Sequence, residues 1–142
     1  MSIDPPPINE IVIEQNGLAK IPWILFFNNI FEGDSGTPWE PVFTNLTIVG
    51  TPQITGRYYR INQNLCFFYI EIVPDTSTTA TAGTTYVGNF PLTFQHDSAC
   101  WAVSGGVGDG PGHIVAATNR IYVPGWSAVT VPITVIGIGA AR

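Results

Sequence analysis

Hydrophobic and polar positions alternate along much of the chain after residue 42, with the two-residue period of a β-strand. Turn-forming residues interrupt the alternation at short intervals, and Asn62-Gln63-Asn64 is one such signal for a hairpin turn. About eight short strands with frequent turns predict an all-β fold, an antiparallel β-sandwich or jelly roll. The predicted strands are Phe43–Val49, Gln53–Ile61, Leu65–Pro74, Thr84–Val87, Ala99–Ser104, His113–Ala117, Arg120–Pro124 and Thr130–Ile138.

The predicted strand Leu65–Pro74 is unusual because apolar side chains occupy both of its faces, with Glu71 as the only charge. An antiparallel sheet usually shows one face to water. We therefore expect one face to fill the core and the other to form a subunit interface. The core set is Cys66, Phe68, Ile70 and Ile72, and the other face carries Leu65, Phe67, Tyr69 and Val73, of which Leu65, Phe67 and Tyr69 are the predicted interface residues.

The hydrophobic pattern also gives predictions for the last strand and for two tryptophans. The predicted strand Thr130–Ile138 alternates in the ordinary way, so its outer face is expected to be wetter. Trp101 stands in an apolar run and is predicted to belong to the core. Trp126 falls in a turn, Pro124–Ser127, where packing over one end of the sandwich is favoured. The alternative for Trp126 is an exposed indole that stacks on a sugar or a partner.

The first 41 residues lack this period and are predicted to form an anchoring arm, with residues 42–142 as a separate β-domain. Met1–Asn9 is rich in proline, which predicts an extended segment. Gly33–Pro41 is rich in turn formers and is the predicted linker between the two parts.

Pro22–Phe31 is predicted to be one short helix, because a proline suits the first helical position and a glycine follows the end. This helix would be apolar nearly all round. Burial between subunits or in a larger host structure is therefore favoured over packing on the chain's own β-domain. The predicted anchor residues are Trp23, Phe26, Phe27, Ile30 and Phe31.

The composition of the chain is less charged and more apolar than that of an ordinary soluble domain. Only 11% of the 142 residues are charged, against about a quarter in ordinary soluble domains, and the mean hydropathy is +0.24. We expect much of the surface to be buried against copies of the chain or other proteins. The net charge of −5 comes from residues 1–42, which hold six acids against Lys20; residues 43–142 hold four acids and four arginines. The clustered Lys and Arg of a nucleic-acid interface are missing.

No catalytic constellation stands out, so a protein without enzymatic activity, cofactor or metal is predicted. His96-Asp97-Ser98 has the residue types of a triad, but a triad is assembled in space rather than from adjacent residues. The glycine-dense stretch Gly105–His113 lacks the Lys-Ser/Thr of a phosphate loop. It is predicted to be a flexible exposed loop, with a contact loop as the functional alternative. The candidate partner-contact residues are Asp109, His113 and Trp126.

Cys66 and Cys100 lie in apolar strand-like runs, where two buried free thiols are favoured over a disulfide. Met1–Pro7 has three prolines and no basic residue, unlike a signal peptide. The longest apolar run, Ile21–Phe27, is too short to span a bilayer, so membrane insertion is not expected.

Several segments resemble small structural proteins of tailed bacteriophages. The Pro-rich start followed by Pro22–Phe31 is similar to the opening of many phage virion proteins. Thr51–Ile61, continuing to Leu65–Phe68, resembles the first strands of trimeric jelly-roll domains in phage fibres and head decorations. Asn89–Leu92, Ile121–Pro124 and Ile133–Val135 resemble a later turn and the closing strands of the same domains.

The resemblance covers most of the chain and implies a homotrimer, attached to the virion through its N-terminal segment and assembled in the host cytoplasm. Its expected role is a capsid decoration or cement protein, or a head-fibre knob, with itself and other capsid or tail proteins as partners. No long repetitive shaft is present, which favours a compact knob over a complete tail fibre. The alternative is a tail-associated receptor-binding module that contacts a host surface glycan.

Overall fold

The computed structural model describes residues 36–142, which form twelve β-strands and no helix within that range. The predicted helix Pro22–Phe31 and its anchor residues lie outside the described residues. The strands are β1 (Thr37–Trp39), β2 (Phe43–Thr44), β3 (Thr47–Val49), β4 (Gln53–Arg60), β5 (Cys66–Val73), β6 (Ser77–Ala80), β7 (Tyr86–Val87), β8 (Ser98–Ser104), β9 (Val107–Ile114), β10 (Ile121–Tyr122), β11 (Trp126–Val129) and β12 (Ile133–Gly139).

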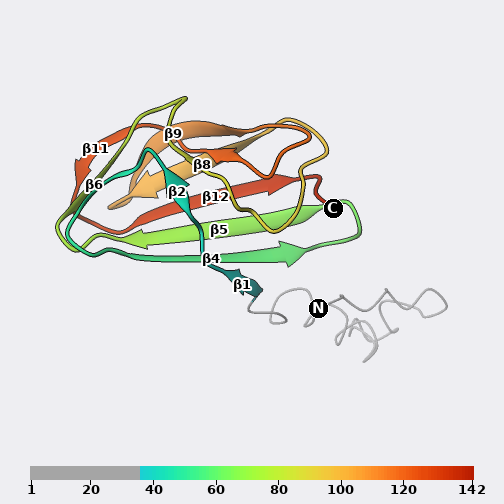
Figure 1. The fold of residues 1–142 in the computed structure, drawn as a ribbon, viewed down its shortest axis with the longest axis horizontal. Helices are drawn as coiled ribbons and strands as arrows, with labels where there is room; N and C mark the ends of the chain where they lie inside the picture. The colour runs from blue at the N-terminus through green and yellow to red at the C-terminus, as the bar shows by residue number, and fades with distance from the viewer. Residues whose placement is uncertain (1–35) are drawn as a thin grey trace, which may run out of the picture.

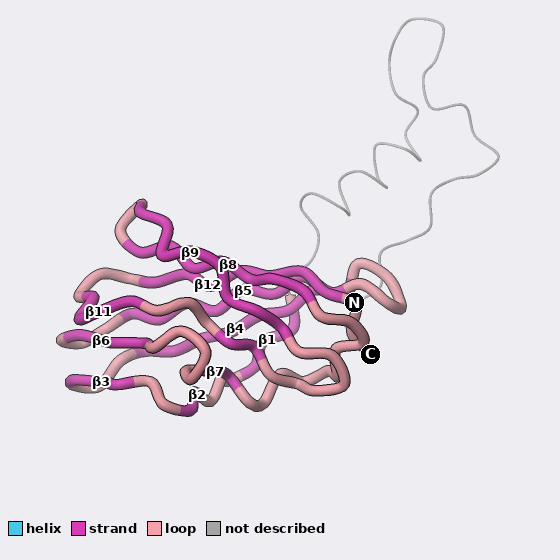
Figure 2. The backbone as a smooth tube through the Cα atoms, turned by 90° about the horizontal axis from the view of Figure 1, so that it is seen from above, coloured by secondary structure: helices cyan, strands magenta, loops and turns pink. Residues whose placement is uncertain are grey.

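Nine strands form one antiparallel sheet in the order β1-β4-β5-β12-β8-β9-β10-β7-β2 (Figure 1). Its two edge strands, β1 and β2, are separated by only residues 40–42 along the chain. Three residues span on the order of 10 Å when extended, so the opposite edges of the sheet must lie close together. The sheet is therefore curled into a half-barrel, and Figure 2 shows β8, β9 and β12 on one side with β2 and β7 on the other.

The remaining strands form a small sheet in the order β11-β6-β3. The predicted strand Phe43–Val49 is split between the two sheets at Asn45, whose φ of 60° is left-handed and breaks an extended strand. Asn45 is fixed by two hydrogen bonds: its Nδ2 donates to the Thr84 carbonyl at 3.2 Å, and its carbonyl accepts from the Thr85 hydroxyl at 2.8 Å.

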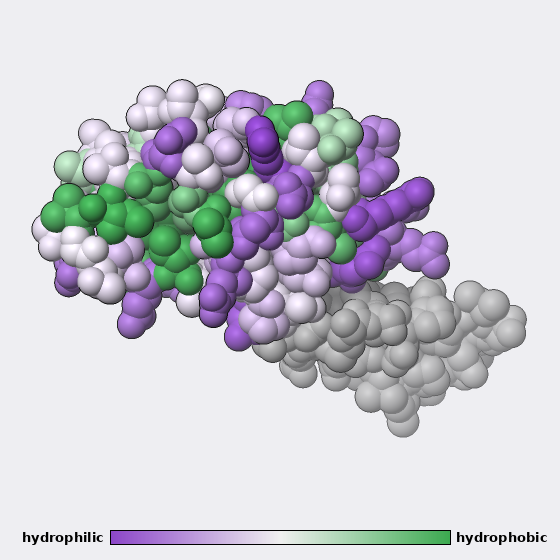
Figure 3. Space-filling model, in the orientation of Figure 1, coloured by the Kyte–Doolittle hydropathy of each residue, from purple (hydrophilic) through white to green (hydrophobic). Residues whose placement is uncertain are grey.

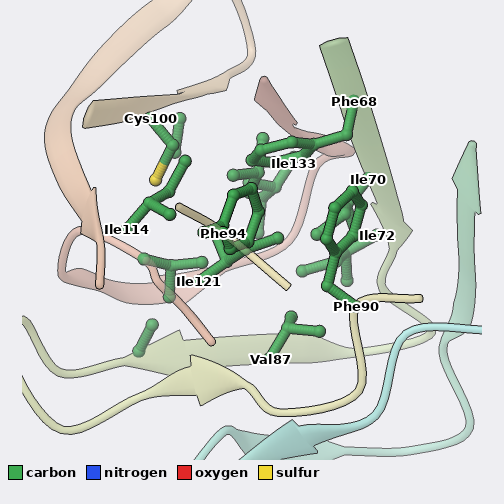
Figure 4. Packing of buried hydrophobic residues seen from close by; sticks show 14 of the residues in the cluster. Phe68, Ile70, Ile72, Val87, Phe90, Phe94, Cys100, Ile114, Ile121 and Ile133 are labelled. Atoms are coloured by element: carbon green, nitrogen blue, oxygen red, sulfur yellow. The ribbon is translucent and has the colours of Figure 1, made fainter. Parts of the chain in front are cut away.

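One hydrophobic core lies between the walls of the curled sheet and the small sheet. Strand β5 faces it as predicted, since its core set of Cys66, Phe68, Ile70 and Ile72 is fully buried. Phe90 and Phe94 stack at 4.8 Å and 7° beside them. Figure 4 shows side chains from both walls meeting in this cluster, and the small sheet contributes Ala80 and Trp126. The all-β prediction is confirmed for the described residues.

The glycine-dense stretch forms strand β9 and not the predicted flexible loop. Gly105 (φ 55°) and Gly106 (φ 81°) make a two-residue turn between β8 and β9, where two positive φ values suit a tight hairpin. Glycine also lets the strands approach, because a Cβ at Gly112 would collide with the Tyr122 carbonyl. Pairing with β8 thus overrides the low strand propensity of glycine.

Three further strands lie where the sequence pattern predicted turns or no strand. Strand β1 falls inside the predicted linker, pairs with β4 and packs Trp39 against the core, so residues of the linker belong to the large sheet. Strand β6 is Ser-Thr-Thr-Ala and has no apolar alternation. Strand β11 begins at Trp126, inside the predicted turn.

Candidate interaction surface

The outer face of the large sheet carries a contiguous apolar row where most sheets are polar. The backbone register aligns residues across four strands: Tyr69 of β5 pairs with Ile136 of β12, and Ile136 pairs with Trp101 of β8. One step along, Tyr59 of β4 pairs with Phe67, and Phe67 with Ile138. We call these two rows the outer strip: Tyr59, Phe67, Tyr69, Trp101, Ile136 and Ile138.

Exposure of the outer strip is high for side chains of this kind. Trp101 is 53% exposed, Ile138 47% and Ile136 38%. Aromatic contacts hold the other end together, since the Tyr59 ring lies 5.9 Å from Phe67 and 6.4 Å from Tyr69. A contiguous apolar surface of this type marks an interaction site on a soluble domain.

The structure places the predicted interface residues Leu65, Phe67 and Tyr69 in the outer strip or directly next to it in the chain. Phe67 and Tyr69 are half-buried members of the outer strip, and Leu65 is half-buried immediately before β5. Strand β5 therefore carries apolar side chains on both faces, and only one of these faces is buried in the core.

Trp101 was predicted to be in the core, and that prediction is wrong. Its neighbours Cys100 and Ala102 point inward at 0% and 1% exposure, so strict alternation turns Trp101 outward. Trp126 is only 6% exposed, so the packing favoured from the sequence is confirmed and the alternative of an exposed contact residue is wrong. Its Nε1 donates to the Thr78 hydroxyl at 3.2 Å, which ties β11 to β6 inside the molecule. Trp126 is therefore a core residue and offers no contact to a partner.

Asp109 is the extra residue of a β-bulge, because Ala102 pairs with Gly110 while Val103 pairs with Gly108. The Ser104 hydroxyl donates to its Oδ1 at 3.1 Å. Its Oδ2 is buried and has no hydrogen-bond partner among residues 36–142. The carboxylate thus turns toward the base of the hairpin, which makes it a poor candidate for the partner contact predicted at this position.

His113 is exposed on β9 and belongs to a row of stacked side chains. Its ring lies 4.6 Å from that of Tyr122 with an angle of 3°, and Tyr122 lies 5.0 Å from Tyr86. The guanidinium of Arg120 sits 5.0 Å above the Tyr86 ring, a cation–π arrangement. Of the three candidate contact residues, His113 alone remains exposed at an aromatic surface.

The sequence pattern missed Ile136, Ile138 and Trp101 as surface residues. The sequence of β12 contains a feature that indicates outward-facing isoleucines, because Gly137 and Gly139 alternate with Ile136 and Ile138. Both glycines face inward because aromatic rings already fill the space there; a Cβ at Gly137 would lie 2.5 Å from Cζ of Phe68. Two large residues separated by inward glycines must point outward.

A second exposed apolar area lies on the far side of the molecule. Val42, Ile48 and Val49 are 59%, 43% and 49% exposed, and β3 is an edge strand of the small sheet. Figure 3 shows apolar side chains gathered at the end of the molecule that holds β6 and β11. This area carries no aromatic side chain among its exposed large residues, unlike the outer strip.

Both cysteines are buried free thiols, as favoured from the sequence. Burial raises the pKa of each thiol from 9.0 to about 11. The Cys100 thiol contacts the Tyr122 carbonyl at 3.4 Å. Low reactivity follows, since the thiolate is the reactive form of cysteine.

Residues 36–142 contain no group of three or more His, Cys, Asp or Glu side chains placed to hold a metal ion. Within the same residues no helix has the length and hydropathy needed to cross a membrane. Comparison with protein-family models, with curated proteins and with solved structures finds no match.

Proposed function

We propose that this chain is a structural protein of a bacteriophage virion, a trimeric capsid decoration or head-fibre knob of jelly-roll type, attached through its N-terminal arm. The proposal joins the resemblance of its sequence segments to phage structural proteins with the surface of the β-domain. It has no enzymatic step, and its work is to bind copies of itself and a virion partner.

The outer strip is the observation that carries this proposal. Trp101, Ile136 and Ile138 are each more than one-third exposed in the single chain. Leaving such side chains in water is unfavourable, and burial of each large apolar side chain contributes about 1.5–3 kcal/mol. A protein that works as part of an assembly supplies the missing cover.

The test is the assembly state of Phe67→Asp, which places a charge in the centre of the outer strip. Sedimentation at micromolar concentration should give a trimer for the unchanged protein and a monomer for the variant. Ile48→Asp is the matched control, because Ile48 is 43% exposed on the small sheet; it should leave the trimer intact. A monomeric unchanged protein would refute the trimer.

The virion part of the proposal has its own test. Purified particles should contain the full-length protein and should lose it when residues 1–35 are deleted. Incorporation of the truncated chain would place the attachment in the β-domain.

The second candidate function is a tail-associated receptor-binding module, and the row of His113, Tyr122, Tyr86 and Arg120 favours it. Aromatic rings beside a guanidinium are suited to the apolar faces and anionic groups of sugars. A glycan array separates the two functions: binding that is lost in Arg120→Ala and kept in Phe67→Asp would support the receptor module.

A further inference from the structure

The outer strip begins beside the place where the chain enters the described part of the molecule. Gly36 is the first described residue and is buried. The Tyr59 ring lies over it, since a Cβ at Gly36 would be 2.7 Å from Cζ of Tyr59. Arg57, also on the outer face of β4, donates from Nη1 to the Gly36 carbonyl at 3.2 Å. The preceding residues therefore leave from the edge of the sheet next to the outer strip.

The length of chain before Gly36 is sufficient to cross this surface. Four residues lie between Phe31 and Gly36, so the Cα atoms of these two residues are five steps apart and at most about 17 Å from each other. Gly36 directly precedes β1, and adjacent strands are spaced about 4.8 Å apart, so from β1 the distance is about 14 Å to β12, three strands away, and about 19 Å to β8, four strands away. Phe31 can thus reach the level of Ile136, and the residues before it in Pro22–Phe31 can reach the level of Trp101 without leaving their own subunit.

The composition of Pro22–Phe31 and of the acids that follow it is also complementary to the outer strip and Arg57. Pro22–Phe31 contains only Asn28 and Asn29 as polar residues and needs an apolar partner. Glu32 and Asp34 follow directly and would lie near the positive charge of Arg57. An apolar segment ending in two acids thus matches an apolar strip flanked by an arginine.

We infer that the outer strip is the docking site for Pro22–Phe31 of the same chain. The segment crosses the sheet from Tyr59 toward Trp101. Because it is apolar nearly all round, its outward side stays apolar and forms the contact between copies; this last step rests on the proposed trimer. The interface between subunits is then built in two layers, the strip and the segment laid over it.

A photo-cross-linking experiment on the full-length chain tests this assignment. Benzoylphenylalanine replaces Trp101 in one sample and Ile48 in a control sample, both at exposed positions. Isotopically light and heavy proteins are mixed before assembly, and cross-linked peptides are identified by mass spectrometry. We expect cross-links from position 101 to residues 22–31 within one isotope label, and a loss of those cross-links when the reactive group is at position 48.

Three results would overturn the inference. Cross-links from position 101 to residues 36–142 of the other isotope label would mean that a second β-domain covers the strip, while the proposed self-assembly stands. Cross-links to residues 22–31 of mixed labels would mean that a neighbouring copy supplies the segment. A monomer without cross-links from position 101 would remove both the inference and the proposed trimer.

Discussion

Trp101 and Trp126 lie on strands of different sheets, and only the side chain of Trp126 faces the core. Trp126 is 6% exposed and hydrogen-bonded to Thr78, whereas Trp101 is 53% exposed. Composition alone cannot separate them, since a tryptophan suits a core and an interface equally. At the scale of single residues, strand register decides whether a side chain stabilises the fold or offers a contact.

Gly137 should be among the least replaceable residues of β12. In Gly137→Ala the new Cβ meets the fully buried Phe68 ring at 2.5 Å, and overpacking of a dense core costs about 1–3 kcal/mol. The matched control is Gly108→Ala, where no atom lies within 4 Å. Urea denaturation should show a lower free energy of unfolding for the first variant, and for the second a change within about 0.5 kcal/mol. Equal effects would contradict the packing described for β12.

The buried thiols should make stability depend on pH in the alkaline range. Their folded-state pKa of about 11 exceeds the ordinary value of 9.0, so the unfolded chain loses these protons first. Their stabilising contribution is therefore complete below pH 9 and is lost as the pH rises toward 11. The free energy of unfolding should fall more steeply over this window in the unchanged protein than in the double variant Cys66→Ala, Cys100→Ala. Parallel curves would count against the burial of these thiols.

At the scale of elements, the two-residue hydrophobic period was sufficient to predict the strands with alternating apolar residues. It was insufficient to predict the other strands. It located β4, β5, β8 and β12, because each places large residues on one buried face. It missed β6, whose Thr78 is buried only through contact with Trp126 and pairing with β3 and β11. It also missed β9, where the hairpin with β8 holds glycines in an extended strand. These strands are specified by the strands with which they pair and not by an apolar pattern of their own.

The candidate surface was predictable to the same extent. Phe67 and Tyr69 could be assigned because both faces of β5 are apolar, and one strand cannot bury both in its own core. Trp101, Ile136 and Ile138 required the registers of β8 and β12, which bring residues more than 30 positions apart into one row.

The edge strand β1 should set the true boundary of the folding unit. Its Trp39 packs against Phe90 at 5.2 Å and Tyr58 at 6.1 Å. A chain of residues 36–142 should melt cooperatively, whereas residues 42–142 should lose about 3 kcal/mol or more, the usual cost of removing a packed aromatic side chain. Circular dichroism during thermal unfolding measures both. Equal melting temperatures would show that the unit begins at residue 42.

At the scale of the whole molecule, polar contacts fasten the two edges of the curled sheet. Asn89 accepts from the Val42 amide at 2.9 Å and donates to the Glu40 carbonyl at 2.8 Å. The Gly88 amide donates to the Val42 carbonyl at 3.2 Å. Together with the pairing of β2 and β7, these bonds hold the short connection between β1 and β2 against the end of β7.

This connection also determines how the domain responds to tension. A pull on the N-terminal side reaches β1 first, which is held by three residue pairs and contains Pro38, a residue without an amide proton. Peeling away β1 releases residues 37–39, about 10 Å of slack, before the load meets the Asn89 contacts at Glu40 and Val42. The C-terminal strand β12 is locked between β5 and β8 at the centre of the sheet. Tension applied at the N-terminal side should therefore detach β1 and withdraw Trp39 from Phe90 and Tyr58 first, while the central strands stay paired.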